Sequence, residues 1–197
     1  YDIITAIIGP FHSVPQVNLY SMGGDCVGSG YFQRVTNTSF DTMTWYKPTM
    51  DLNGHKYISS PQVFLDLPGQ GENQVSRKYI SLTRLFFNEA HEPQGIIEVI
   101  QDCNQIFNLI PELKKNNPYV SIYVYNDRGE LLYPYYRDVY NDYLSLIEKD
   151  ATGPSTEEMI SYTDENNEEH LVNYKYINDY DWTVITSEPK DSIYYSI

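Results

Sequence analysis

The chain has 197 residues, of which 41% are hydrophobic and 15% aromatic, so it holds enough apolar material for a substantial core, which disfavours disorder. Its formal net charge is −14, and this excess of acidic side chains disfavours nucleic acid and anionic membrane surfaces as partners. Cys26 and Cys103 are the two cysteines, which excludes a dense disulfide scaffold and leaves two readings open, a single bridge or free buried thiols.

The first ten residues have the pattern of a helix end. Isoleucines recur at positions 3, 4, 7 and 8, on one helical face, and Pro10 follows them. Because this pattern starts at the first residue, we expect a helix that begins upstream and a chain that is a fragment of a longer protein. The sequence contains no apolar run of about 18 residues and no signal-peptide pattern.

Strand-like segments dominate residues 15–101. Residues 17–20 and 27–31 predict a hairpin, joined by a turn at Gly23-Gly24-Asp25. Residues 37–54 surround Trp45 and Tyr46 with turn-forming residues, and we expect a loop or short helix over the sheet. Further strands are predicted at residues 56–60, 75–82 and 96–100.

The clearest boundary follows the next helix. Asp102 is expected to cap a helix that runs to Lys115 and ends at Asn116-Asn117-Pro118. Beyond this point, two short strands around the turn Asn126-Asp127-Arg128-Gly129 predict a hairpin. A helix between Asp138 and Lys149 follows. Three strands complete the chain, at residues 159–163, 171–176 and 182–187.

This order of elements predicts an α+β fold. A long N-terminal helix, truncated in this chain, precedes two PAS-like antiparallel-sheet domains. We assign residues 1–117 to the helix end, the first domain and the linking helix, and residues 118–197 to the second domain.

Six segments follow one another as they do in a known family: Pro15–Tyr20, Trp45-Tyr46, Val75–Ile80, Gly95–Ile100, Ser121–Leu132 and Trp182–Val184. Their succession covers nearly the whole chain and resembles the double-Cache sensor domains of bacterial membrane receptors. The resemblance implies a module on the extracellular face of the membrane, between two transmembrane helices, with a membrane-distal domain followed by a membrane-proximal one. The sequence is most similar to modules of Gram-positive sensor histidine kinases and related regulators.

The resemblance also implies a small-molecule pocket in the first domain, beneath the loop that contains Trp45 and Tyr46. A subgroup of the family that binds amino acids carries an Arg and an Asp at positions that are Met43 and Ile100 in this sequence. The absence of both charges argues against an amino-acid ligand.

Seven residues are candidates for contact with a ligand. Aromatic rings suit partly polar ligands, and an arginine in a strand-like run can bind an anionic group through paired hydrogen bonds. The candidates are Trp45, Tyr46, Tyr31, Tyr57, Phe64, Arg77 and Tyr79. The alternative for the aromatic residues is core packing, and for Arg77 it is a surface position or a structural salt bridge.

No motif predicts catalysis. The patterns Gly-x-Ser-x-Gly, His-Glu-x-x-His and the P-loop are absent from the sequence, and the four histidines are isolated. We therefore expect no catalytic residue, metal or cofactor. The acidic run 164–169 predicts a solvated hairpin turn, with a weak calcium site as the alternative.

The leading hypothesis is that the chain is the extracellular sensor domain of a transmembrane receptor, and that this receptor is a histidine kinase. The expected partners are a small-molecule ligand, the membrane through flanking helices outside the chain, a second copy in a homodimer and a solute-binding protein. Two alternatives remain: a structural or protein-interaction domain without a ligand, and a secreted hydrolase or carbohydrate-binding module.

Overall fold

The structure is a computed structural model that describes residues 14–37, 39–64, 67, 77–136, 143–150, 158–164 and 166–195. The N-terminal helix predicted from the sequence lies outside these residues. The chain divides into two compact units, Tyr1–Ile106 and Phe107–Ile197. Each unit is built on an antiparallel sheet with few helices, which confirms the α+β class.

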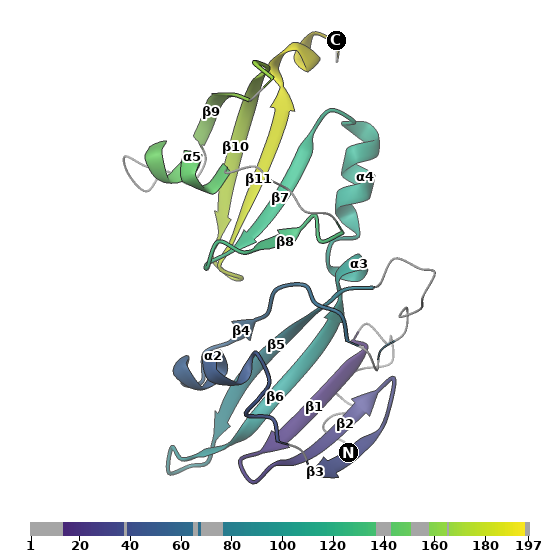
Figure 1. Ribbon diagram of the computed structural model, residues 1–197, viewed down its shortest axis with the longest axis vertical. Helices are drawn as coiled ribbons and strands as arrows, with labels where there is room; N and C mark the ends of the chain where they lie inside the picture. Colours follow the sequence, from purple (N-terminus) through teal and green to yellow (C-terminus); the bar gives the residue numbers. More distant parts are fainter. Residues whose placement is uncertain are drawn as a thin grey trace. The chain divides into compact units, whose positions relative to one another are not determined.

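The first unit has a six-stranded sheet with the order β3-β2-β1-β6-β5-β4 (Figure 1). Its elements are β1 (Gln16–Ser21), β2 (Asp25–Gly30), β3 (Arg34–Asn37), α2 (Tyr46–Asp51), β4 (Tyr57–Ile58), β5 (Tyr79–Phe87), β6 (Pro93–Asp102) and α3 (Cys103–Ile106). The central strand β6 pairs with β1 on one side and β5 on the other, and it leads directly into α3.

Side chains of β6 alternate between the two faces of this sheet, because successive residues of a strand point to opposite sides. Ile96, Glu98 and Ile100 are buried on one face, whereas Ile97 and Val99 are half-buried against Val17 on the other. The first face carries the main apolar cluster of the unit: Tyr20, Cys26, Phe40, Trp45, Leu85 and Ile96. Helix α2, which Figure 1 shows beside β4 and β5, packs against this cluster.

The second unit has a five-stranded sheet with the order β8-β7-β11-β10-β9. Its elements are α4 (Leu109–Asn116), β7 (Ser121–Asn126), β8 (Leu131–Tyr133), α5 (Tyr143–Asp150), β9 (Glu158–Thr163), β10 (Glu169–Ile177), β11 (Trp182–Pro189) and the 3-10 helix η1 (Lys190–Tyr195). Tyr143 of α5 lies against Tyr123 of β7, with ring centroids 4.9 Å apart, and both belong to the core cluster that includes Val172 and Ile185.

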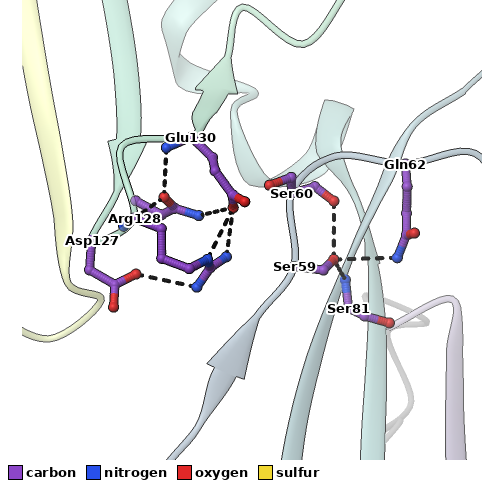
Figure 2. A network of polar contacts seen from close by, with 8 residues as sticks. Ser59, Ser60, Gln62, Ser81, Asp127, Arg128 and Glu130 are labelled. Carbon is purple, nitrogen blue, oxygen red and sulfur yellow. Dashed lines mark hydrogen bonds and ion pairs between the residues drawn. The ribbon is translucent and has the colours of Figure 1, made fainter. Parts of the chain in front are cut away.

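The turn between β7 and β8 confirms the predicted hairpin. The Asn126 side-chain oxygen accepts the backbone N–H groups of Arg128 at 3.0 Å and Glu130 at 2.9 Å. Gly129 has φ +74°, a conformation that glycine adopts without steric cost. As Figure 2 shows, the Arg128 guanidinium then reaches both Asp127, at 3.3 Å, and Glu130, at 2.8 Å.

The helix predicted from Asp102 to Lys115 is divided into α3 and α4. Asp102 does cap the first piece, since its Oδ1 accepts the backbone N–H of Asn104 at 2.8 Å. In the described part of the chain, no helix has the length and apolar character needed to span a lipid bilayer.

Candidate functional site

A row of polar side chains crosses the centre of the first sheet, on the face that α2 covers. Strand register places Asn18 of β1 and Thr83 of β5 on either side of Glu98 of β6. All three side chains are buried, as are the neighbouring polar residues of this face. We call this set the polar floor; it comprises Gln16, Asn18, Ser81, Thr83 and Glu98.

Glu98 is the centre of the polar floor and is 2% exposed. Its Oε2 accepts hydrogen bonds from Asn18 Nδ2 and from the Tyr20 hydroxyl, both at 2.9 Å. Its Oε1 accepts a short hydrogen bond from the Ser81 hydroxyl. Among the side chains that the structure describes, no basic group forms an ion pair with Glu98. The carboxylate is thus held by neutral donors alone.

The polar floor is fixed to its surroundings by further hydrogen bonds. The Thr83 hydroxyl lies 2.5 Å from that of Thr49 in α2, and Thr49 also donates to the Trp45 carbonyl at 2.6 Å. At the other side of Ser81, the Ser59 hydroxyl accepts the Ser81 backbone N–H at 2.9 Å, a contact drawn in Figure 2. Because buried polar groups need partners, the Thr49–Thr83 bond stabilises the position of α2 over the sheet, and the Ser59–Ser81 bond fixes the segment after β4.

An aromatic cluster adjoins the polar floor and consists of Tyr20, Phe40, Trp45 and Tyr46. The Tyr20 ring centroid lies 5.2 Å from that of Trp45 and 5.4 Å from that of Phe40. Phe40 also meets Tyr46 edge to face, at 5.4 Å. Tyr20 therefore joins the two features, because its hydroxyl reaches Glu98 while its ring packs among the aromatic side chains.

The outer side of this cluster borders a surface cleft of about 370 Å³. Its lining comes from the β1–β2 turn, the end of β3, the segment before α2 and the first residue of α2: Met22, Gly23, Gly24, Asn37, Ser39, Phe40, Asp41 and Tyr46. Phe40 and Tyr46 thus have one side toward the cluster and another toward the cleft.

Three of the predicted ligand residues meet around the aromatic cluster. Trp45 is 3% exposed and belongs to the apolar core, and Tyr46 and Tyr57 are half-buried against the same core. Of these three residues, Tyr46 lines the cleft.

The other predicted residues lie elsewhere on the first unit. Phe64 packs edge to face on the buried Tyr79, with ring centroids 6.1 Å apart. Arg77 Nη1 lies 3.5 Å from Asp102 Oδ2, which is the structural salt bridge foreseen as its alternative role. Burial raises the pKa of Tyr79, and the Asp102 carboxylate raises it further. Tyr31 is 57% exposed, after β2.

The sequence interpretation missed Glu98. Of the two positions at which the sequence resemblance implies charged residues in amino-acid-binding members, Ile100 is buried and Met43 is 37% exposed. Glu98 lies two residues before Ile100 and therefore on the same face of β6. An acidic residue between Ile96 and Ile100, in an alternating strand pattern, was the signal that could have revealed it.

The two cysteines are both free and buried, so the reading as free thiols is confirmed over a bridge. Burial, followed by the nearby Asp102 carboxylate, raises the pKa of the Cys103 thiol to about 12. Cys103 is therefore protonated and unreactive at neutral pH.

The β9–β10 turn of the second unit forms a hairpin, as the acidic run predicted. Asp164, Glu168 and His170 bring their ligand atoms within 4.8 Å of one another, and His170 Nε2 lies 3.5 Å from Asp164 Oδ2. Backbone N–H groups of Glu168 and Asn166 hold the pKa of Asp164 below its usual value. Hydrogen bonding within the turn accounts for this arrangement, and we assign no metal to it.

Similar folds occur among sensor domains of membrane receptors. The extracellular domain of mmHK1S-Z2, described as a histidine kinase, has a TM-score of 0.68 and 11% identity over 98% of this chain and 81% of its own. The periplasmic sensory domain of the Campylobacter jejuni chemoreceptor Tlp1 has a TM-score of 0.67 and 12% identity, over 100% of this chain and 79% of its own. The ligand-binding domain of the Pseudomonas aeruginosa amino acid chemoreceptor PctC, in complex with GABA, has a TM-score of 0.61 and 14% identity, over 91% of this chain and 77% of its own.

No protein-family model matches the sequence, and no curated protein matches it. The likeness to the solved structures concerns the fold, and at that level it confirms the resemblance seen in the sequence. The chain shares its fold with these sensor and ligand-binding domains of histidine kinases and chemoreceptors.

Proposed function

We propose that this chain is the extracellular sensor module of a transmembrane signal-transduction receptor, and that this receptor is a histidine kinase. A small molecule binds in the first unit, between the polar floor and the segment that carries Trp45 and Tyr46. The module itself performs no catalysis. In this proposal residues 1–117 hold the end of a long N-terminal helix, the first PAS-like domain and the linking helix, and residues 118–197 form the second PAS-like domain. Flanking helices outside the chain anchor the receptor in the membrane.

The polar floor is the observation that carries the proposal. Folding buries five polar side chains on one sheet face, although apolar residues at these positions would form a core without the cost of desolvating a carboxylate. Ligand pockets need a few fixed polar groups beside apolar and aromatic walls, and the polar floor beside the aromatic cluster provides that composition. The similar sensor domains, one of them in complex with GABA, support the same role.

Signalling follows if the ligand binds one arrangement of α2 and the sheet more tightly than another, because a ligand shifts an equilibrium only by its difference in affinity for the two states. Thr49 and Trp45 connect α2 to the polar floor and the aromatic cluster. From Glu98, strand β6 runs to Asp102 and into α3, which offers a direct route out of the site.

Thermal denaturation of the purified chain across a library of amines, organic acids, sugars and amino acids tests this function. We expect at least one compound to raise the melting temperature, and isothermal calorimetry to give saturable binding. Replacing Thr49 by Val, which removes its bond to Thr83 but keeps its shape, should change the affinity. A library without any stabilising compound would contradict direct ligand sensing.

A second candidate is a protein-interaction role without a small ligand, such as homodimerisation or contact with a solute-binding protein. The observation in its favour is that Trp45 and Glu98 are 3% and 2% exposed, so the centre of the first unit is closed in this structure. For this role we expect a stable dimer or a captured binding protein, and no response to the library. A jelly-roll carbohydrate-binding module has two packed sheets, which the single described sheet of each unit does not match.

A further inference from the structure

The charge of Glu98 has no partner of opposite sign among the described side chains. A buried carboxylate is normally paired with a cation, because removing it from water is costly. Three neutral donors, Asn18, Tyr20 and Ser81, compensate part of that cost at this site. The arrangement therefore has the electrostatic capacity to accept one cation.

Glu98 also has an acceptor position to spare. An ionised carboxylate offers about four lone-pair sites. Asn18 and Tyr20 both donate to Oε2, whereas Ser81 alone donates to Oε1. One further donor, such as an N–H of an ammonium group, can bind at Oε1 without displacing any of the three.

The aromatic cluster favours the same class of ligand. The faces of aromatic rings attract cations, most strongly for tryptophan; the Tyr20 hydroxyl reaches the carboxylate, and Trp45 packs on the Tyr20 ring with centroids 5.2 Å apart. The net charge of −14 adds a negative field that raises the local concentration of cations near the chain.

The polar floor offers no counterpart for an anion. Its side chains are amides, hydroxyls and one carboxylate, and none of them is basic. The Arg77 guanidinium, the predicted anion-binding group of this unit, lies 3.5 Å from the Asp102 carboxylate. A carboxylate on the ligand would thus meet Glu98 without a compensating charge.

We propose that the ligand of this sensor is an organic amine or quaternary ammonium compound without a carboxylate group, and that its cationic centre binds at Glu98. This inference rests on the proposed sensor function and names its ligand class. Because Glu98 is buried under the α2 segment, the ligand enters as Trp45 and Thr49 move away from the sheet, and the apparent affinity is reduced by the fraction of open molecules.

Matched four-carbon probes test the charge requirement: 1,4-diaminobutane, 4-aminobutanoate and butanedioate, with choline as a quaternary amine. Each is added to the purified chain in thermal denaturation and calorimetry. We expect diaminobutane or choline to raise the melting temperature, butanedioate to have no effect, and 4-aminobutanoate to bind at least tenfold more weakly than the better amine.

Three variants locate the site. Glu98→Gln should weaken amine binding at least tenfold, whereas Glu112→Gln, which removes an exposed charge from α4, should leave it unchanged. Ser81→Ala removes one donor from Glu98 and should tighten amine binding. If Glu98→Gln fails to fold, Ser81→Ala still tests the proposal. Its expected effect is a higher amine affinity, and loss of a residue with a purely structural role would not raise that affinity.

The outcomes separate the two proposals. Binding of a neutral or anionic library compound, with no response to the amines, overturns the amine assignment and leaves the sensor function standing. Amine binding that Glu98→Gln and Ser81→Ala do not change also overturns the assignment. If no compound of either set binds, both proposals fail.

Discussion

At the scale of single residues, Tyr20 and Tyr176 form a matched pair. Each hydroxyl donates to a carboxylate at 2.9 Å, Tyr20 to Glu98 and Tyr176 to Asp181, but the two tyrosines are 2% and 48% exposed. Tyr20→Phe should lower the free energy of unfolding by about 1.5–3 kcal/mol, because a buried carboxylate loses a donor that water does not replace. Tyr176→Phe should change it by less than about 0.5 kcal/mol.

Urea denaturation of both variants measures these values, and circular dichroism checks that the Tyr20→Phe fold is retained. Equal effects at the two positions would mean that Glu98 is already solvated or replaces the lost donor, and the polar floor would then contribute little to the stability of the first unit.

The raised pKa of Cys103 gives a dependence on alkaline pH. In the folded chain the pKa is raised from its usual 9.0 to about 12, so between these values the unfolded chain has lost a proton that the folded chain keeps. Stability present below pH 9 is therefore lost as pH rises toward 12, with a slope of up to about 1.4 kcal/mol per pH unit for this proton. Cys103→Ala should make the loss shallower in urea titrations between pH 8 and 11.

The same burial predicts protection of the thiol. At pH 8 iodoacetamide should leave Cys103 unmodified in the folded chain and alkylate it after unfolding in urea, as mass spectrometry of the peptide shows. Rapid alkylation without urea would contradict the closed environment of this residue.

Residue roles were the least predictable part of the molecule. The sequence indicated large aromatic residues near a pocket, and the structure gathers Trp45, Tyr46 and Tyr57 around one cluster. It did not indicate that Tyr20 would join this cluster to Glu98, because hydrogen bonds between strands distant in sequence depend on register. For Arg77 the sequence left ligand binding and a structural salt bridge open, and Asp102, at the end of β6, provides the ion-pair partner of the second alternative.

At the scale of elements, Gly95 allows β6 to approach β1. A Cβ atom at this position would lie 2.1 Å from the Tyr20 carbonyl oxygen and 2.7 Å from the Phe86 ring. Gly95→Ala should therefore destabilise the first unit by about 1–3 kcal/mol, since backbone atoms must move. Gly23→Ala is the control: its Cβ would meet nothing nearer than 3.6 Å, and we expect a change below about 0.5 kcal/mol.

Chemical denaturation measures both glycine variants. A tolerated Gly95→Ala would show that the β1–β6 register adjusts, and the alignment of Asn18 with Glu98 would then be less rigid than their hydrogen bond suggests.

Most strands were predictable because alternation of apolar and polar residues identifies them locally. Both hairpins and the last three strands were predicted within a few residues of β1, β2, β7, β8, β9, β10 and β11. Strand β3 was missed, since Arg34–Asn37 lies at an edge of the sheet and its one apolar residue, Val35, is 71% exposed, so the segment has no alternation of apolar and polar residues. The break between α3 and α4 was also missed, because the apolar residues keep helical spacing across it.

At the scale of the whole molecule, the two tryptophans report separately on the two units, Trp45 on the first and Trp182 on the second. Each described core cluster draws its residues from one unit, so we expect the units to unfold independently.

A substitution at Ile185, which is fully buried in the second unit, tests this expectation. In single-tryptophan backgrounds, Ile185→Ala should lower the stability reported by Trp182 by about 2–5 kcal/mol and that reported by Trp45 by less than about 0.5 kcal/mol. Ile96→Ala in the first unit should show the reverse. Equal shifts at both tryptophans would show one cooperative molecule, in which a ligand at Glu98 acts on both sheets at once.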